Sequence, residues 1–156
     1  NIVTFNKNEL SFNYRKSKLS DGNFILLSAE FELNKANYND INELMKRNVE
    51  FRKNHQPSLA FGNAGSVFKN PVNDSAGRLL DLSGCKELVE GGAKVYEKHA
   101  NFIINTGNAT STDVLQLMLE MKQRVKEKFN INLIPEICFL GNNEEEDLLC
   151  QMLYLK

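Results

Sequence analysis

The stretch of this sequence best suited to chemistry is GNAGSVFKNP, residues 62–71. Glycines placed before a hydroxyl let the backbone approach a ligand closely, and Lys69 and Asn70 add polar groups that suit a phosphate or a sugar. The stretch is not a P-loop, because the G-x-x-x-x-G-K-[ST] spacing is absent. Two interpretations stay open: a structural loop, and a binding loop, which the length of the connection over 56–73 favours.

Ser66 supplies the hydroxyl of this stretch, and its surroundings limit its chemistry. No nucleophile elbow is present, since G-x-S-x-G does not match. A serine without an adjacent base is a poor nucleophile, but it can still pass a proton to a carbanion or an enolate. The alternative is a turn hydroxyl that bonds to nearby backbone. Ser66 is therefore a candidate proton donor.

Two charged residues are further candidates. Arg15, between Tyr14 and Ser17, could clamp a carboxylate or a phosphate with two hydrogen bonds, or it could be an ordinary surface arginine. Glu136 stands among apolar residues in a predicted strand. It either faces solvent on an edge, which the adjacent Pro135 suggests, or reaches a site where its pKa is raised.

The histidines and cysteines do not indicate a metal site or a disulfide framework. We expect His55 and His99 to be structural groups, and we predict no metal ligand. The three cysteines follow no C-x-x-C spacing, so we expect free thiols that pack as small hydrophobes: Cys85, Cys138 and Cys150. Free thiols suit a reducing cytoplasm, which is the predicted location.

The composition is that of an ordinary globular chain. It has 156 residues, 42% of them hydrophobic and 25% charged, with a net charge of −1. This length is enough for a domain of moderate size with a real core. The charge balance argues against a dedicated nucleic-acid binder, and no apolar run approaches the roughly 18 residues of a membrane span. The first residues also lack the layout of a signal peptide.

The elements that must position the candidate residues are helices and short strands. Apolar and acidic residues alternate toward the end of 24–33, which predicts a strand with one solvated side. Helical spacing predicts a helix over about 40–54, stopped by Pro57, and a short helix follows over about 75–82.

The second half of the chain continues this mixed pattern. Residues 102–104 predict a buried strand, and an apolar stripe after the caps at 110–113 predicts a helix. Residues 133–140 predict a strand with an edge or a bulge at Pro135. A short helix with an acidic first turn is predicted within 142–156. The connections are too irregular for βαβ repetition, so the fold class is α+β.

Four motifs, in order, give the chain a family resemblance. They are F-x-Y-R-x-S at 12–17, R-x-x-x-Q-P at 52–57 with N-A-G-S-x-F-K-N-P at 63–71, G-G-A at 91–93 with K-H-A-N-F-I-x-N at 98–105, and E-[VI]-x-x-[IL]-G at 136–141. The chain resembles the C-terminal half of the UDP-N-acetylenolpyruvoylglucosamine reductases, flavoenzymes of bacterial wall synthesis. The similarity spans about residues 8–141. Tyr96 departs from it, because many members have serine after G-G-A-x-V.

The resemblance implies an NADPH- and FAD-dependent oxidoreductase that converts UDP-N-acetylglucosamine enolpyruvate to UDP-N-acetylmuramate. In such enzymes NADPH reduces bound FAD, and the flavin delivers hydride to the vinyl methylene carbon of the enolpyruvyl group. By the family pattern Ser66 donates the proton to the neighbouring carbon, while Arg15 and Glu136 stabilise and polarise the enol intermediate. These roles agree with a serine that lacks a base and an arginine that suits a carboxylate gaining charge.

The resemblance also implies binding residues. Lys69 and Asn70 would contact the substrate, and Gln56 would order the same wall of the site. Gly65 and Tyr14 are assigned to cofactor binding. No metal, nucleic acid or membrane is expected to take part.

The implied fold is an α+β substrate-binding domain with an antiparallel sheet packed by helices. We expect 1–34 to be the C-terminal end of a flavin-binding module, 35–141 the substrate-binding domain, and 142–156 a tail. The family's N-terminal flavin-binding region, with its glycine-rich pyrophosphate loops, is absent. We therefore expect a fragment whose partner is that region of the same protein, and which alone binds FAD weakly or not at all and does not turn over.

Two other classes stay open. A non-enzymatic UDP-sugar-binding module could keep the same scaffold, although it need not retain Arg15, Ser66 and Glu136 together. A related flavin oxidase would not need the N-A-G-S-x-F-K-N-P loop.

Overall fold

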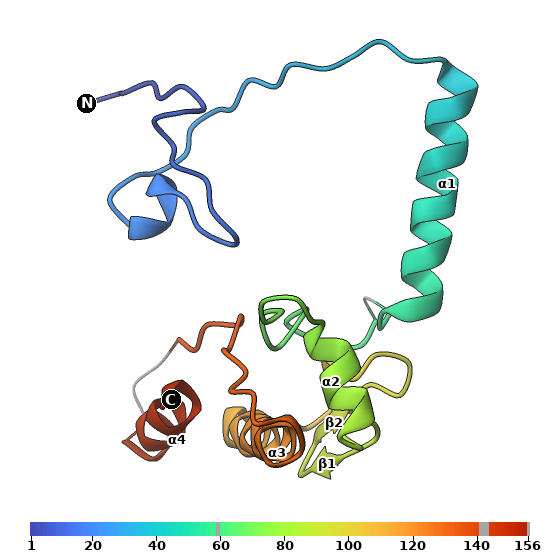
Figure 1. Ribbon diagram of the computed structural model, residues 1–156, viewed down its shortest axis with the longest axis vertical. Helices are drawn as coiled ribbons and strands as arrows, with labels where there is room; N and C mark the ends of the chain where they lie inside the picture. The colour runs from blue at the N-terminus through green and yellow to red at the C-terminus, as the bar shows by residue number, and fades with distance from the viewer. Residues whose placement is uncertain (59, 141–143, 156) are drawn as a thin grey trace. The chain divides into compact units, whose positions relative to one another are not determined.

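The computed structural model describes residues 1–58, 60–140 and 144–155. The chain divides into two compact units, Asn1–Asp40 and Ile41–Lys156, and each unit is described by itself. The elements run in the order η1, α1, α2, β1, β2, β3, α3 and α4 (Figure 1). They form an α+β fold, as the sequence predicts.

The first unit is held together by a small aromatic cluster. The rings of Phe5 and Phe24 meet edge to face with centroids 5.1 Å apart, and the ammonium of Lys18 lies 4.2 Å from the Phe5 centroid. Lys18 also begins η1, a short 3-10 helix over Lys18–Asp21. These contacts fold the chain locally, in a unit where most side chains are exposed.

The strand predicted over 24–33 is not formed. Residues 23–37 have no regular secondary structure, and Phe31 and Leu33 are 77% and 84% exposed. A strand needs a neighbour to accept and donate its backbone hydrogen bonds, and none of the described residues pairs with this segment. The alternating pattern over 24–33 therefore suits a strand, but this segment belongs to no sheet among the described residues.

The helix predicted over 40–54 is confirmed as α1, Tyr38–His55. Asp40 lies in its first turn and Arg52, Lys53 and His55 in its last, so the charges complement the helix dipole. None of its residues is buried, although it carries an apolar stripe that remains partly exposed: Ile41, Leu44, Met45 and Val49.

A three-stranded antiparallel sheet forms the centre of the second unit. Its strands are β1, Val89–Glu90, β2, Ala93–Val95, and β3, Ile103–Asn105, in the order β1-β2-β3. In this register Val89 faces Lys94, and Lys94 faces Ile104. The antiparallel sheet that the resemblance implied is thus present, with β3 matching the strand predicted over 102–104.

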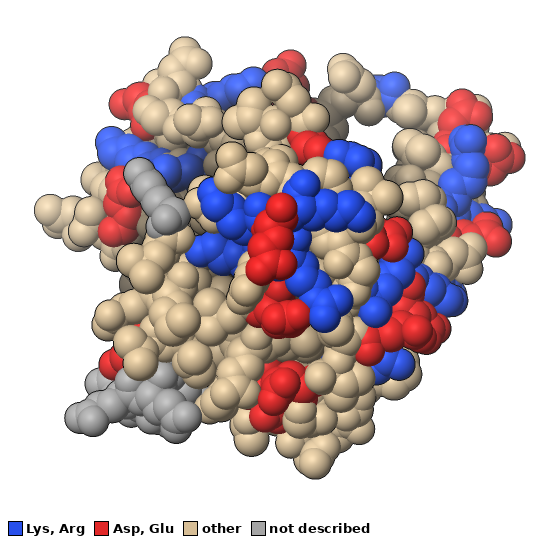
Figure 2. Space-filling model, turned by 60° about the horizontal axis from the view of Figure 1, so that its bottom comes forward, with Lys and Arg blue, Asp and Glu red and all other residues tan. Residues whose placement is uncertain are grey.

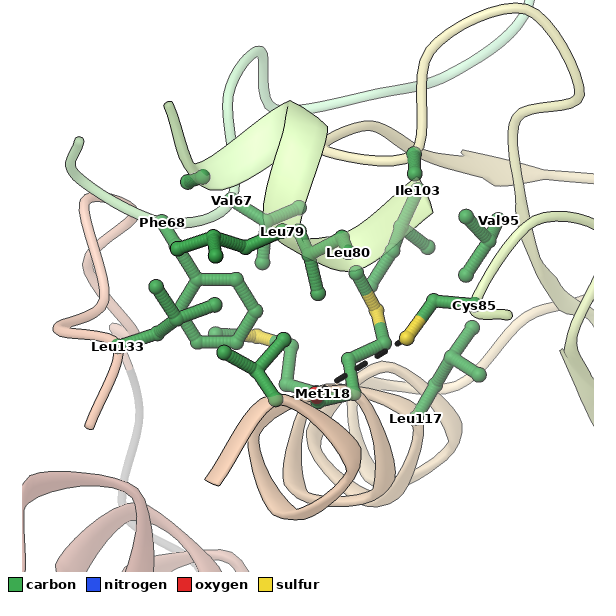
Figure 3. Packing of buried hydrophobic residues seen from close by; sticks show 14 of the residues in the cluster. Val67, Phe68, Leu79, Leu80, Cys85, Val95, Ile103, Leu117, Met118 and Leu133 are labelled. Atoms are coloured by element: carbon green, nitrogen blue, oxygen red, sulfur yellow. Dashed lines mark hydrogen bonds between the residues drawn. The ribbon is translucent and has the colours of Figure 1, made fainter. Parts of the chain in front are cut away.

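Two helices contribute to the core beside this sheet. They are α2, Ala76–Leu82, and α3, Ser111–Phe129, and α3 contacts α2 as well as β1 and β2. Figure 3 shows the buried side chains that meet between them: Val67, Phe68, Leu79, Leu80, Cys85, Val95, Ile103, Leu117, Met118 and Leu133. Each fully buried Leu or Phe contributes roughly 1.5–3 kcal/mol, so this cluster stabilises the unit.

Asp113 ties the beginning of α3 to the turn between β1 and β2. The hydroxyl of Thr110 accepts from the Asp113 N–H at 3.1 Å, and the carboxylate of Asp113 accepts from Thr110 N–H at 2.9 Å and from Gly92 N–H at 3.0 Å. Those backbone bonds, first from Thr110 and then from Gly92, lower the pKa of Asp113. A side chain at Gly92 would not fit, because its Cβ would lie 2.3 Å from Ala109 N.

The strand predicted over 133–140 is wrong for most of its length. Only Pro135 takes part in a bridge, opposite Phe68, and the remaining residues of that range are irregular. Proline has no N–H to donate to a ladder, which explains why pairing does not continue through this position.

The chain ends in a helix, α4, over Glu144–Tyr154, where the sequence predicts a short one. It packs against α3 through Leu153, which is 1% exposed. The ammonium of Lys122, on α3, donates to the carbonyl oxygens of Leu153 at 2.6 Å and Leu155 at 2.8 Å. Residues 142–143 and 156 of the predicted tail lie outside the described residues.

Candidate active site

The segment 66–69 lies between two other stretches of backbone. On one edge Ser66 bridges Phe102, and Val67 N–H donates to the Asn101 carbonyl at 2.9 Å. On the other edge Phe68 bridges Pro135. The central part of the predicted chemical loop is therefore fixed on both sides.

The second edge brings the backbone of Glu136 close to that of Ser66, and both are predicted catalytic residues. Glu136 N–H donates to the Val67 carbonyl at 2.8 Å, and Lys69 N–H donates to the Ile134 carbonyl at 2.9 Å. Glu136 thus stands opposite Val67, the residue directly after Ser66. Both Ser66 and Glu136 are half-buried, so each is accessible and each is held by a packed backbone.

The loop before Ser66 is shaped by an asparagine and a glycine. Asn63 accepts from Gly65 N–H at 3.1 Å through its side-chain oxygen, and its amide donates to the Phe61 carbonyl at 3.0 Å. Gly65 has φ +81°, a conformation that favours glycine, and an added Cβ there would meet nothing within 4 Å. The backbone beside Ser66 is therefore open on this side.

The predicted substrate-binding residues differ in the contacts that they make within the chain. The carboxamide oxygen of Asn70 accepts from Ala76 N–H at 3.0 Å, so this oxygen caps the first turn of α2. Gln56 accepts from Arg52 Nε at 3.3 Å, which explains the pairing of arginine and glutamine in R-x-x-x-Q-P. Lys69 is half-buried and is the last residue of the fixed segment 66–69.

His99 occupies a structural position, as the sequence predicts. Its Nδ1 accepts from Asn101 N–H at 3.2 Å, and its ring meets Phe102 edge to face at 4.9 Å between centroids. The ring also lies against Gly77, where an added Cβ would come within 2.8 Å of it. Burial lowers the pKa of His99, so the neutral ring with an acceptor at Nδ1 is favoured.

The other two predicted residues belong to the unit Asn1–Asp40. Tyr14 and Arg15 form the tip of a tight turn that is closed by two backbone bonds between Asn13 and Lys16, of 2.8 and 3.1 Å. Arg15 has φ 55°, the left-handed region, which is uncommon for an arginine. Its guanidinium carbon lies 5.9 Å from the centroid of the exposed Tyr14 ring. The turn thus presents an aromatic ring and a cation together.

A cavity of about 260 Å³ lies beside the loop that precedes Ser66. It is lined by the loop before Ser66, by the end of β3 and by the first turn of α3, and its residues include Asn63, Val67, Asn105, Thr110 and Ile137. Apolar walls with a few polar groups are typical of small-molecule sites.

Sequence reasoning missed Asn101, which is buried and contacts the same segment. Its signal was present, since it is a polar residue inside the otherwise apolar run 100–104. Only the structure shows that its partner is Phe68, which lies far away in the sequence.

The described residues carry surface charges of both signs and no metal-binding cluster. Figure 2 shows basic and acidic side chains interleaved on one face. Among the described residues, Lys86 and Asp81 form an ion pair at 2.7 Å. Among the described residues, no group of three His, Cys, Asp or Glu side chains is placed to hold a metal ion. In the described part of the chain, no helix has the length and apolar character needed to cross a membrane.

The fold, the loop and the neighbouring cavity define an α+β domain with a candidate small-molecule site, and comparison with known proteins gives its family. The model of the family "UDP-N-acetylenolpyruvoylglucosamine reductase, C-terminal domain" matches residues 56–140, more than half of the chain. The chain belongs to this family.

Curated relatives carry the same name over a longer stretch. The reductase of Caldanaerobacter subterraneus is 45% identical over 141 residues, which are 90% of this chain and 46% of the relative. That of Enterococcus faecalis is 39% identical over 140 residues, with the same coverage of 90% and 46%. The chain therefore spans a little less than half the length of these relatives.

A solved structure agrees. The crystal structure of UDP-N-acetylenolpyruvylglucosamine reductase from Thermus caldophilus matches with a TM-score of 0.66 and 39% identity. The match covers 81% of this chain and 44% of the other.

Proposed function

We propose that this chain is the substrate-binding part of an FAD- and NADPH-dependent reductase that converts UDP-N-acetylglucosamine enolpyruvate to UDP-N-acetylmuramate during peptidoglycan synthesis in the cytoplasm. The observation that carries the proposal is the loop with Ser66, which is paired by backbone bonds with the segment of Glu136 inside a domain of this family. The names of the relatives support the same substrate.

Ser66 acts as the proton donor in this proposal. Its hydroxyl gives a proton to the carbon beside the substrate carboxylate, where negative charge builds during reduction. A half-buried hydroxyl on a backbone fixed at both edges suits this step, because proton transfer needs a donor held within hydrogen-bond reach of the carbon.

Arg15 and Glu136 stabilise the charge that develops. Arg15, at the tip of its turn, binds the substrate carboxylate, since a guanidinium matches a carboxylate with two hydrogen bonds. Glu136 polarises the enol from the segment next to Ser66. The left-handed backbone of Arg15 supports a functional role, because such conformations concentrate at active sites.

The cofactor fits the residues that this chain offers. When bound, FAD supplies the hydride that it receives from NADPH. The open backbone at Gly65 and the exposed ring of Tyr14 are the groups that would contact a flat ring system. We assign the remaining cofactor contacts to an N-terminal flavin-binding region, of which residues 1–34 are the end. The alternating pattern over 24–33 supports this, since it suits a strand that pairs with such a region.

The substrate nucleotide is bound by the domain over 35–141. Lys69, the last residue of the fixed segment, supplies a cation for the diphosphate. The side-chain amides of Asn70 and Gln56 complete the same wall. The carboxamide oxygen of Asn70 is engaged by Ala76, so we assign its NH₂ group to the substrate.

The test uses a chain that includes the proposed flavin-binding region. We expect its NADPH oxidation under anaerobic conditions to depend on UDP-N-acetylglucosamine enolpyruvate and to yield UDP-N-acetylmuramate. Binding of the UDP-sugar without any oxidation would instead favour a non-enzymatic binding module. A flavin-loaded protein that ignores the substrate would indicate a different flavoenzyme.

A further inference from the structure

Asn101 is unusual among the described residues because it is a polar side chain in the interior. It is 3% exposed, and only Lys122 shares this class of buried polar residue within the described part of the chain. A buried amide costs free energy unless all its groups are hydrogen-bonded. The partners of Asn101 therefore explain why an amide occupies this position.

The side chain of Asn101 pairs with both backbone polar groups of Phe68, its N–H and its carbonyl. Its Oδ1 accepts from Phe68 N–H at 2.9 Å, and its Nδ2 donates to the Phe68 carbonyl at 2.9 Å. A carboxamide has one acceptor and two donors in the geometry of a backbone peptide, so here it replaces a neighbouring strand. The Asn101 main-chain carbonyl extends the pairing by accepting from Val67 N–H at 2.9 Å.

This pairing acts on the segment that carries Ser66. Asn101 holds one edge of Val67 and Phe68, and the backbone of Ile134 and Glu136 holds the other. Without the amide, Phe68 would have an unpaired N–H and carbonyl on the Asn101 side, and the segment could shift between its neighbours. A shift of about 1 Å in a reacting group costs about 100-fold in rate.

We propose that Asn101 is a positioning residue that sets the place of Ser66 relative to Glu136. It does so without touching the reacting atoms. The expected effect of Asn101 on catalysis rests on the proposed function. Its role in holding the segment of Ser66 rests on the Phe68 contacts alone.

The substitution that tests this is Asn101→Asp in the protein that includes the flavin-binding region. Aspartate has nearly the same shape, but its second oxygen faces the Phe68 carbonyl where the amide donated. We expect kcat for substrate reduction to fall about 100-fold, with substrate Kd changed less than threefold and with the rate of flavin reduction by NADPH unchanged. A second variant, Asn101→Ser, is too short to reach both Phe68 groups and introduces no charge, so it covers the case in which Asn101→Asp does not fold.

Two further measurements separate positioning from general destabilisation. Hydrogen exchange at the Phe68 N–H should accelerate at least tenfold in Asn101→Ser, which removes the Oδ1 acceptor of that N–H, while exchange in α3 keeps its wild-type rate. Cys85→Ala is the matched control, because it removes a buried side chain of the same core away from the loop. It should lower the melting temperature without changing kcat of the folded enzyme.

The outcomes distinguish this inference from the proposed function. Wild-type kcat in both Asn101 variants, or a loss that only follows the unfolded fraction as in Cys85→Ala, would overturn the positioning role. If the wild-type protein shows no substrate-dependent oxidation, the proposed function fails. Exchange at Phe68 then decides the inference by itself: acceleration supports the structural role of Asn101, and an unchanged rate overturns it.

Discussion

The N–H of Glu136 donates to the carbonyl oxygen of Val67 at 2.8 Å, which fixes Glu136 beside the residue that follows Ser66. The link is made by backbone atoms on both sides. Side-chain substitutions at Ser66 or Glu136 should therefore leave the arrangement intact, so that their effects on the reaction can be measured separately from folding.

We predict that Ser66→Ala lowers kcat for substrate reduction by roughly 10²–10⁴-fold, the usual contribution of a positioned proton donor. Its melting temperature should stay close to that of the wild type, because the backbone pairing remains. Ser66→Cys, which keeps an ionisable proton at the same position, should retain more activity than the alanine variant. Stopped-flow measurement of substrate reduction tests this, and an alanine variant with wild-type kcat would remove Ser66 from the mechanism.

The turn between β1 and β2 should not tolerate a side chain. Gly92→Ala places a Cβ 2.3 Å from Ala109 N, so backbone must move, whereas at Gly62 the nearest atom to an added Cβ is Asn105 Cβ at 3.5 Å. We expect Gly92→Ala to lower the free energy of unfolding by about 2 kcal/mol, and Gly62→Ala to change it far less. Urea denaturation of both variants is the measurement, and equal stabilities would contradict the crowding argument.

Asp113 should make stability depend on acid pH. Backbone bonds from Thr110 and Gly92 lower its pKa in the folded state, so its contribution is complete above the unfolded pKa of about 4 and is lost as the pH falls through the folded value. Asp113→Asn should therefore be less stable than the wild type at pH 7, and the difference should shrink toward pH 3. Thermal unfolding between pH 3 and 7 measures this, with Glu97→Gln, an exposed change, as the control. A difference that is constant with pH would contradict the prediction.

The cysteines should differ in reactivity. Burial raises the pKa of the Cys85 thiol to about 11, so it stays protonated at pH 8, while Cys138 is exposed. We expect an aromatic disulfide reagent to modify Cys138 quickly in the folded protein and Cys85 only after unfolding. Comparison of the wild type with Cys138→Ser assigns the fast phase. A fast phase that persists in Cys138→Ser and is lost in Cys85→Ala would mean that the core opens readily.

Helices were predictable from the sequence because their signals are local. The apolar spacing of α1 and α3 lies within those helices, and the N-caps of α2 and α3, Ser75 and Thr110, lie one residue before them. The strand predicted over 24–33 and most of that over 133–140 were wrong because a strand depends on a partner elsewhere in the chain. Neither residue alternation nor Pro135 specifies that partner.

The site was predictable to the extent that its motifs are contiguous. GNAGSVFKNP identified the loop, and Glu136 stood out by its apolar neighbours. Asn101 also stands among apolar neighbours, but its role could not be recognised from that, because it depends on a contact with Phe68, 33 residues away. Likewise, the engagement of Asn70 by Ala76 follows from the start of α2, which the motif does not encode.

The hydrogen bonds between Lys122 and the end of α4 depend on the length of that helix. The ammonium reaches carbonyls of Leu153 and Leu155, which are free to accept only because the helix ends there. One residue inserted into α4 would advance these carbonyls by about 1.5 Å and rotate them by about 100°. Lys122 therefore restricts the length of α4. In a helix one residue longer or shorter, its buried ammonium would no longer meet the carbonyl oxygens at the helix end.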